Sequence, residues 1–282
     1  TALSEGQIAK IGAVETGSTG LFHTVDTEKE LRRILEGAHR AGQLCVDLET
    51  TSLNPREAVI VGFALSYDSD AGYYVPVSHR GHGGRQLELR RVLEALRPVL
   101  VDARIKKIGQ NLKYDWSVLH EQGRQGEQGV DLQGIGADTL VAAYVLDPIG
   151  KHNFDALCEK YLSYQTLKFE DVCGKGKDQI TFDQVPIPLA TRYAAEDALY
   201  TFRLWETLRP RLHAEGLMEV FARVELPLVP VLARMECEGV CLDGDWLKKL
   251  SHQFGSELMA LEERLRAYAK GPVNLNSPKQ MA

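Results

Sequence analysis

The chain has 282 residues, of which 44% are hydrophobic and 26% are charged, and its formal net charge is −6. These proportions are typical of a globular protein with a sizeable core, and the length favours one large domain plus a smaller one. No apolar run approaches the roughly 18 residues of a membrane span, the N-terminal segment lacks a signal-peptide layout, and the acidic balance argues against a protein that coats long stretches of duplex. We therefore expect a cytoplasmic protein with no membrane partner.

The cysteines form no Cys-x-x-Cys pair and no spacing that is typical of disulfides or of a zinc site. Reduced thiols in apolar surroundings are the better interpretation. They are Cys45, Cys158, Cys173, Cys237 and Cys241.

The first half of the chain alternates β-rich and helical patterns. Residues 1–19 are small and polar and are expected to be a lead-in. Thr27 and Glu30 form a capping-box pattern at the start of a helix. The nearly continuous apolar run at 43–50 is expected of a central strand. The other elements expected here are a strand at 21–27, a helix at 28–42, an antiparallel hairpin of strands at 58–68 and 72–78, a helix at 86–100, a strand at 106–111 and a helix at 112–123.

The second half is helical, with helices expected at 139–147, 154–163 and 188–216. A strand meander followed by βα units predicts an α/β fold whose mixed sheet is flanked by helices. Near residue 212 the pattern changes to a proline-interrupted helical stretch, and then to a long amphipathic helix at 245–271 that Asp243 or Asp245 would cap. We expect a short all-helical C-terminal piece.

Two carboxylates lie two residues apart in Asp47-Leu48-Glu49, so on a strand both point to the same face. Like charges held this close persist when a divalent cation or a shared proton compensates them. The alternative is a strand-end turn in which Asp47 caps a helix and Glu49 is solvated. Because the neighbouring residues are apolar, and an acid within a buried run needs a partner, the first interpretation is favoured.

A third acid follows the strand at 106–111. Asn111 is a good N-cap, which would place Tyr114 and Asp115 in the first turn of the next helix. Ligands bind at the carboxyl ends of strands in α/β sheets. Taken alone, Asp115 is better explained as an acid that complements the helix dipole.

A fourth acid, Asp197, lies four residues after Tyr193, so the two share one face of a predicted helix. Small Ala194 and Ala195 would let this helix pack closely, and Glu196 is expected to face water. Together, three acidic segments on one mixed sheet are far more specific than any one of them.

Phosphodiester hydrolysis places charge on the attacking water, the non-bridging oxygens and the leaving 3′-oxygen. Two divalent cations about 4 Å apart can stabilise both the attacking and the leaving oxygen, and hard cations such as Mg²⁺ or Mn²⁺ prefer carboxylate ligands. A phenol with an ordinary pKa of about 10 is neutral at pH 7 and suits orienting a water. The acids therefore indicate metal-dependent hydrolysis.

Three segments resemble the exonuclease motifs of the proofreading domain of bacterial family A DNA polymerases, which belong to the tyrosine-containing class of DEDD exonucleases. They are CVDLETTSLNP, KKIGQNLKYDWSVL and RYAAEDALYTFRLW. The segment VELPLVPVLARMECEGVCLD resembles the start of the polymerase thumb in that family. The resemblance implies a ribonuclease-H-like exonuclease domain at 20–212 and the N-terminal part of a polymerase domain at 213–282.

The resemblance also implies roles for individual residues. Asp47, Glu49 and Asp197 match the ligands of a tightly held cation, where Zn²⁺ is an alternative to Mg²⁺ or Mn²⁺. Asp47 also matches the bridge to a second cation, which Asp115 serves through water. Tyr193 and Glu49 match the pair that orients the attacking water. The residues that match contacts to the DNA strand are Leu53 as a wedge between bases, Phe169 as a stacking residue, and Thr50, Gln110, Asn111, Tyr114 and Lys151.

The expected activity is that of a monomeric 3′→5′ exonuclease that acts on single-stranded or frayed DNA 3′ ends and releases nucleoside 5′-monophosphates. Since no room remains for palm and fingers, the chain is expected to be an excerpt of a longer polymerase. Two alternatives remain: a catalytically weak domain that holds DNA or braces a polymerase, and an RNA-trimming exonuclease of the ribonuclease D kind.

Other signals are better explained without chemistry. The segment 174–177 does not complete a phosphate loop and is expected to be a mobile basic loop. His79 and His82 are expected to be solvated, and His152 is expected to be a cap or packing residue. The two tryptophans expected in the core are Trp116 and Trp205.

Overall fold

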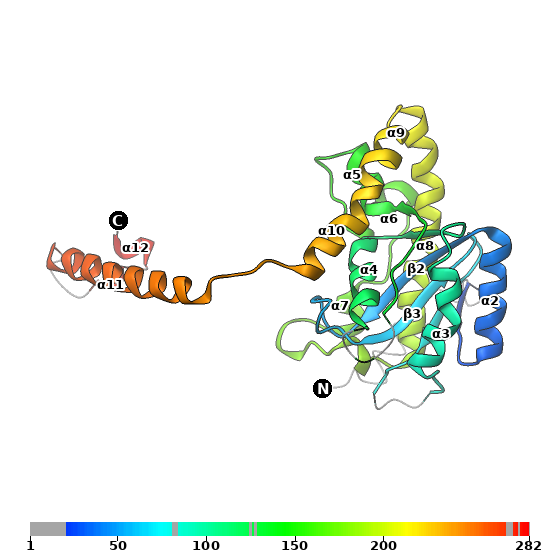
Figure 1. The fold of residues 1–282 in the computed structure, drawn as a ribbon, viewed down its shortest axis with the longest axis horizontal. Helices are drawn as coiled ribbons and strands as arrows, with labels where there is room; N and C mark the ends of the chain where they lie inside the picture. Colours follow the sequence, from blue (N-terminus) through cyan, green and yellow to red (C-terminus); the bar gives the residue numbers. More distant parts are fainter. Residues whose placement is uncertain are drawn as a thin grey trace. The chain divides into compact units, whose positions relative to one another are not determined.

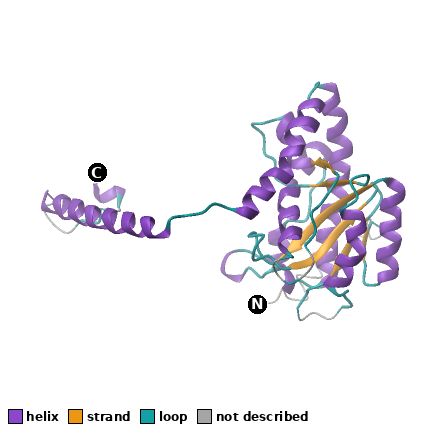
Figure 2. Ribbon diagram, in the orientation of Figure 1, coloured by secondary structure: helices purple, strands orange, loops and turns teal. Residues whose placement is uncertain are grey.

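The structure is a computed structural model that describes residues 21–80, 84–123, 126, 129–268, 273–275 and 277–281. The chain divides into two compact units, residues 1–237 and residues 238–282. The first unit contains a six-stranded sheet covered by helices, and the second is helical (Figure 1, Figure 2). Among the described residues, no helix is both long and apolar enough to cross a membrane.

The strand order of the sheet is β1-β4-β3-β2-β5-β6. The central strand β2 pairs antiparallel with β3 and parallel with β5, and the expected hairpin of β3 and β4 is antiparallel. This mixed sheet with flanking helices confirms the ribonuclease-H-like fold. The strands are β1 (Phe22–Thr24), β2 (Gln43–Thr50), β3 (Ile60–Ser66), β4 (Gly72–Pro76), β5 (Lys106–Gly109) and β6 (Ile135–Asp138), of which β6 was not expected.

Helices cover both faces of the sheet in the first unit (Figure 1). They are α2 (Glu28–Ala41), α3 (Leu89–Leu100), α4 (Leu112–Glu121), α5 (Thr139–Leu146), α6 (Phe154–Leu162), α7 (Phe169–Cys173), α8 (Ile187–Ala214), α9 (Met218–Val220) and α10 (Leu226–Glu238). Between them lie two 3₁₀ turns, η1 (Gly176–Asp178) and η2 (Phe182–Gln184), and a π-helical turn, η3 (Phe221–Glu225). The segment expected to be a basic loop thus contains η1.

The side chains of β2 alternate between two apolar cores. Leu44, Val46 and Leu48 pack with residues of α2 and α3, whereas Cys45 packs in the second core with residues of α8. Because side chains two residues apart share a face, this alternation turns Asp47 and Glu49 toward the α8 side of the sheet.

Helix α8 lies close against the start of β4. A Cβ atom added at Gly72 would stand 1.9 Å from the carbonyl oxygen of Ala195, and Ala194 is fully buried beside it. Only glycine fits this approach, since any side chain would overlap the helix backbone. The expected close packing of the helix at its small residues is confirmed.

Residues 218–237, which the resemblance assigns to the polymerase part, fall within the first compact unit. Phe221 and Leu226 are buried in its second core, and Val229 is buried in its first. The expected helical stretch is confirmed, and it continues through its prolines.

The second unit contains α11 (Gly244–Tyr268) and α12 (Pro278–Met281). Asp243, rather than Asp245, caps α11, because its Oδ1 accepts a hydrogen bond of 2.9 Å from the backbone N–H of Trp246. The expected long helix is confirmed as far as residue 268, and residues 269–271 lie outside the described ranges.

Candidate active site

Three carboxylates from two distant segments meet at one point. Asp47 and Glu49 come from β2 and Asp197 comes from α8, and one oxygen of each lies within 4.8 Å of the others. The strand alternation supplies the first two acids, and the close packing of α8 on the sheet supplies the third. The register of β2 against β3 shifts between Glu49 and Thr50, so the strand is irregular directly after this pair of acids.

The electrostatics of this cluster favour a bound cation. Burial raises the pKa of Asp47 to about 6. Burial, followed by repulsion from neighbouring acids, raises the pKa values of Glu49 and Asp197 well above their usual range. Within the described part of the chain, Glu49 Oε1 is buried and has no hydrogen-bond partner. An unpartnered carboxylate oxygen among other carboxylates fits a hard divalent cation, which would neutralise the charge and satisfy the oxygen.

Asp115 lies beside the cluster at the start of α4. Its Oδ1 accepts a hydrogen bond of 3.0 Å from the backbone N–H of Leu48, the residue between Asp47 and Glu49. Its side chain is buried, and burial followed by the charge of Asp47 raises the pKa of its carboxyl. The structure therefore brings all four predicted acids to one region.

Tyr193 lies one turn before Asp197 on α8. Its ring contacts Phe169 of α7 at a centroid distance of 6.3 Å and Phe182 of η2 at 5.8 Å. Burial, followed by the charges of Asp197 and Glu49, raises the pKa of its phenol. A neutral phenol is thus held next to the acidic cluster by aromatic neighbours.

Comparison with known proteins agrees with this geometry. A family model described as 3′-5′ exonuclease matches residues 22–213. The chain belongs to this 3′-5′ exonuclease family. DNA polymerase I of Pseudomonas aeruginosa is 40% identical over 88% of this chain and 27% of its own length. DNA polymerase I of Rhizobium leguminosarum is 36% identical over 99% of this chain and 29% of its own length. The chain thus spans less than a third of these relatives.

A solved structure shares the fold. The POL domain of Pol1 from M. smegmatis, in complex with DNA primer-template and dNTP, has a TM-score of 0.69 and 21% identity, and the match covers 92% of this chain and 39% of that chain. Residues 22–213, which the family model matches, form a 3′-5′ exonuclease domain, as the motifs predicted.

Two residues predicted to contact DNA in this exonuclease domain are joined to each other. Thr50 Oγ1 and the Tyr114 hydroxyl are 2.5 Å apart, and the hydroxyl also donates to the carbonyl of Ser52. The contact links the end of β2 to the first turn of α4. It therefore connects the two segments that carry Asp47, Glu49 and Asp115.

The other residues of the exonuclease domain that are predicted to contact the DNA strand lie in different surroundings. Leu53 is 94% exposed and Phe169 is 42% exposed, so both can meet a ligand. Gln110 Nε2 donates to the carbonyl of His152 at 3.1 Å. Lys151 is exposed. All of these, with Asn111, stay predictions as DNA contacts.

The predicted start of α4 is confirmed, with Asp115 in its first turn, but Asn111 does not cap the helix with its side chain. Asn111 occupies the N-cap position of α4 with φ of 64°, and its side chain makes no capping hydrogen bond. The carboxylate of Asp138 accepts instead from the backbone N–H of Leu112 at 2.8 Å. Asp138 was not recognised, because it belongs to the short strand β6 that the sequence patterns missed.

Glu196 does not face water, as was expected. Its carboxylate is buried and accepts hydrogen bonds from the Tyr164 hydroxyl at 2.7 Å and from the Leu167 N–H at 2.6 Å, and it pairs with Arg192 at 3.2 Å. It therefore holds the loop before α7 against α8.

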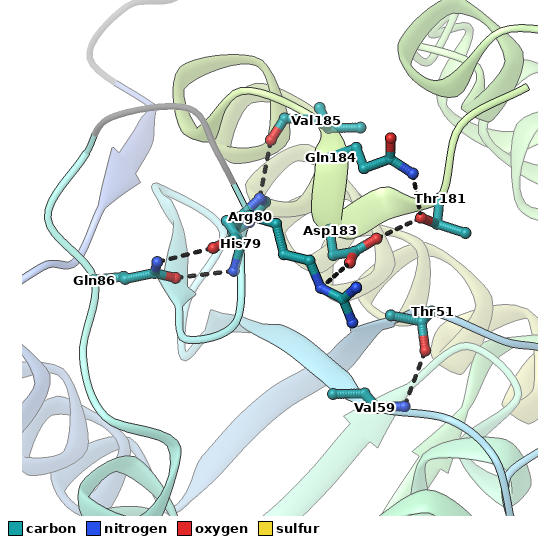
Figure 3. A network of polar contacts seen from close by, with 9 residues as sticks. All are labelled: Thr51, Val59, His79, Arg80, Gln86, Thr181, Asp183, Gln184 and Val185. Atoms are coloured by element: carbon teal, nitrogen blue, oxygen red, sulfur yellow. Dashed lines mark hydrogen bonds and ion pairs between the residues drawn. The ribbon is translucent and has the colours of Figure 1, made fainter.

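His79 is also buried rather than solvated. Its Nδ1 lies 2.9 Å from the Val185 carbonyl oxygen, and Gln86 exchanges two hydrogen bonds with its backbone (Figure 3). The next residue, Arg80, pairs with Asp183 of η2 at 2.8 Å (Figure 3). This network fixes η2, whose Phe182 supports Tyr193. His82 lies outside the described residues.

The expectations for His152, Trp116 and Trp205 are confirmed, and the apolar surroundings expected for the cysteines are found for all but Cys241. His152 packs against Tyr144 at a centroid distance of 4.8 Å, and Trp116 and Trp205 are buried. Four of the five cysteines are buried and Cys241 is exposed, and all five are free thiols.

Proposed function

We propose that this exonuclease domain hydrolyses the 3′-terminal phosphodiester of DNA and releases nucleoside 5′-monophosphates. The observation that carries the proposal is the convergence of Asp47, Glu49 and Asp197 within 4.8 Å. Carboxylates held this close repel one another, and cations at a scissile phosphate would neutralise them.

The residues present fit two divalent cations. Asp47, Glu49 and Asp197 would hold the tighter one, and Asp47 with Asp115 would hold the second. Oxygen-only ligands favour Mg²⁺ or Mn²⁺, and Zn²⁺ is an alternative at the tighter position. When bound, such a pair would stabilise the attacking and leaving oxygens of an in-line displacement.

The protein's own groups would orient the reactants. Tyr193 stays neutral, so its hydroxyl can position the attacking water together with Glu49, but it cannot act as the base. Exposed Leu53 would separate the terminal bases, and Phe169 would stack on one of them. Thr50, Gln110, Asn111, Tyr114 and Lys151 would contact the strand and its phosphates.

This arrangement suits a single-stranded or frayed 3′ end, because a wedge and a stacking residue act on unpaired bases. The partner of the domain would be the remainder of a DNA polymerase I, with proofreading of a growing 3′ end as its task and a monomer as the active form. The relatives that the chain matches carry that name.

The proposal is tested with a 5′-labelled oligonucleotide and Mg²⁺ or Mn²⁺. The wild type should shorten it stepwise from the 3′ end and release mononucleotides. Asp197→Ala should lose at least about 100-fold in rate, because even residues that only support a metal ligand cost about 10- to 100-fold. Asp70→Asn, at an exposed acid between β3 and β4, is the matched control and should match the wild type.

Equal rates for the wild type and Asp197→Ala would exclude this site. Binding of the oligonucleotide without cleavage by either protein would leave a domain that only holds DNA. Competition between DNA and RNA 3′ ends tests the remaining alternative, and faster removal of ribonucleotides would indicate an RNA-trimming enzyme.

A further inference from the structure

We propose that Asp138 is a positioning residue that fixes Asp115 by holding the start of α4 against the start of α5. This inference rests on the proposed function of Asp115. Asp138 is the last residue of β6 and is 1% exposed. Its carboxylate accepts hydrogen bonds from backbone N–H groups at the starts of two helices, so it acts on Asp115 through that backbone. After burial and the charge of Asp47, its charge also contributes to the raised pKa of the Asp115 carboxyl.

One carboxylate serves the first turns of two helices. Asp138 Oδ1 accepts from the N–H groups of Leu140 and Val141 at 3.0 and 3.3 Å, which begin α5. The same carboxylate accepts from the N–H groups of Asn111 and Leu112 at 3.1 and 2.8 Å, which begin α4. The first N–H groups of a helix lack partners within the helix, and a negative charge there is stabilised by the helix dipole.

Helix α4 is capped by the Asp138 carboxylate because the side chain at its own N-cap position makes no capping hydrogen bond. Asn111 adopts the left-handed conformation, with φ of 64° and ψ of 45°, and its side chain does not cap the helix. The neighbouring Thr139 adds a second tie, since its hydroxyl lies 3.1 Å from the Gly109 carbonyl oxygen. The segment that follows β5 is therefore held by two consecutive residues, Asp138 at the end of β6 and Thr139 at the start of α5.

Asp115 lies in the first turn that Asp138 holds. Near the site, α4 is also held by the hydrogen bond from Leu48 N–H to Asp115 Oδ1 and by the contacts of the Tyr114 hydroxyl with Thr50 and Ser52. With Asp138 removed, the helix start would lose two hydrogen bonds, and Asp115 would be held less firmly at the β2 edge. Loss of ligand support of this kind weakens metal binding or activity by about 10- to 100-fold.

A serine at position 138 distinguishes the capping of α5 from the support of α4. Asp138→Ser keeps a good N-cap for α5, but its single hydroxyl cannot serve both helix starts. Asp138→Asn removes the charge and one of the two acceptor oxygens. Thr27→Ala is the matched control, because Thr27 caps α2, where its Oγ1 accepts from Glu30 N–H at 3.3 Å, on a helix that carries no site residue.

Three measurements are made on each variant: hydrogen exchange of the peptide that contains residues 111–121, binding of Mn²⁺ by calorimetry, and the rate of oligonucleotide cleavage. We expect both Asp138 variants to exchange faster at the start of α4, to bind the weaker Mn²⁺ about 10-fold less tightly and to lose about 10- to 100-fold in kcat. Thr27→Ala should lose thermal stability with unchanged kcat and Mn²⁺ binding.

Asp138 variants that fold and retain wild-type exchange, Mn²⁺ binding and kcat would overturn the inference. If neither variant folds, Asp138 is a requirement of the fold rather than of the site, and the inference is equally wrong. If the wild type itself does not cleave DNA, the proposed function fails, whereas exchange and Mn²⁺ binding still report whether Asp138 positions Asp115.

Discussion

The backbone N–H of Leu48 donates to Asp115 Oδ1 across 3.0 Å, from the middle of the Asp47-Leu48-Glu49 segment. Strand β5 pairs with β2 only from Gln43 to Cys45, so further along this edge the carboxylate takes the place of the next strand. The contact explains how an acid that the sequence alone assigns to a helix dipole becomes part of the site.

Asp115→Asn should test that assignment. The amide oxygen can still accept from Leu48 N–H, so the fold should be retained, but the negative charge is lost. We expect kcat to fall by about 100-fold or more with an unchanged or raised Tm. Asp70→Asn removes a charge at an exposed position and should leave kcat unchanged. Wild-type kcat in Asp115→Asn would remove Asp115 from the site.

Tyr193→Phe should separate the hydroxyl from the ring. The ring contacts with Phe169 and Phe182 would remain, so DNA binding should be retained, while kcat should fall by about 10- to 100-fold. Because the pKa of the phenol is raised, the hydroxyl stays protonated across the working range of pH. The pH–rate profile should therefore keep its shape in the variant, and disappearance of its basic limb would contradict a neutral role.

The acidic cluster should make the metal-free protein less stable as the pH rises. A carboxyl with a raised pKa holds its proton more tightly in the folded state than in the unfolded chain. Its stabilising effect is present below the usual pKa of 3.8 and is lost as the pH rises through the folded value, which for Asp47 is about 6.

In EDTA at pH 7, Asp197→Asn should therefore be more stable than the wild type, by about 1–3 kcal/mol. The difference should shrink toward pH 4, and millimolar Mg²⁺ should reverse it by binding only the wild type with high affinity. Thermal unfolding followed by circular dichroism measures both effects. A wild type that is more stable than the variant in EDTA at pH 7 would contradict the prediction.

Leu53→Ala should distinguish paired from unpaired ends. Leu53 is 94% exposed, so truncation should not change the Tm. As a wedge it would act only where bases must be separated, so cleavage of a paired 3′ end should slow several-fold more than cleavage of a single strand. Val240→Ala, at a position that is 84% exposed, controls for loss of surface apolar area. Equal slowing on both substrates would argue against a wedge.

Much of this fold could be predicted because local patterns and tertiary structure agree. The continuous apolar run of β2, the hairpin and the long helices all have periods that the sequence displays. Spacing on a strand places Asp47 with Glu49, and spacing on a helix places Tyr193 with Asp197. The family resemblance then linked these two segments to Asp115, which spacing alone does not connect to them.

The errors concern polar groups whose partners are distant in sequence. Glu196 and His79 resemble solvated residues locally, yet each is buried against segments that the chain reaches only later or earlier. The short strand β6 has too few residues to show a period, and for that reason Asp138 and its bond to Leu112 were missed. Local sequence patterns cannot identify a hydrogen-bond partner such as Asp138, which lies 26 positions from Leu112.

Because Gly72 packs against the backbone of Ala195, a mutational screen restricted to charged residues would miss a position that affects activity. Ala195 lies midway between Tyr193 and Asp197, so a methyl group at position 72 would push against the backbone of the segment that aims both. Gly72→Ala, an apolar substitution outside the predicted DNA contacts, would thus reduce the rate of hydrolysis in a protein that still folds.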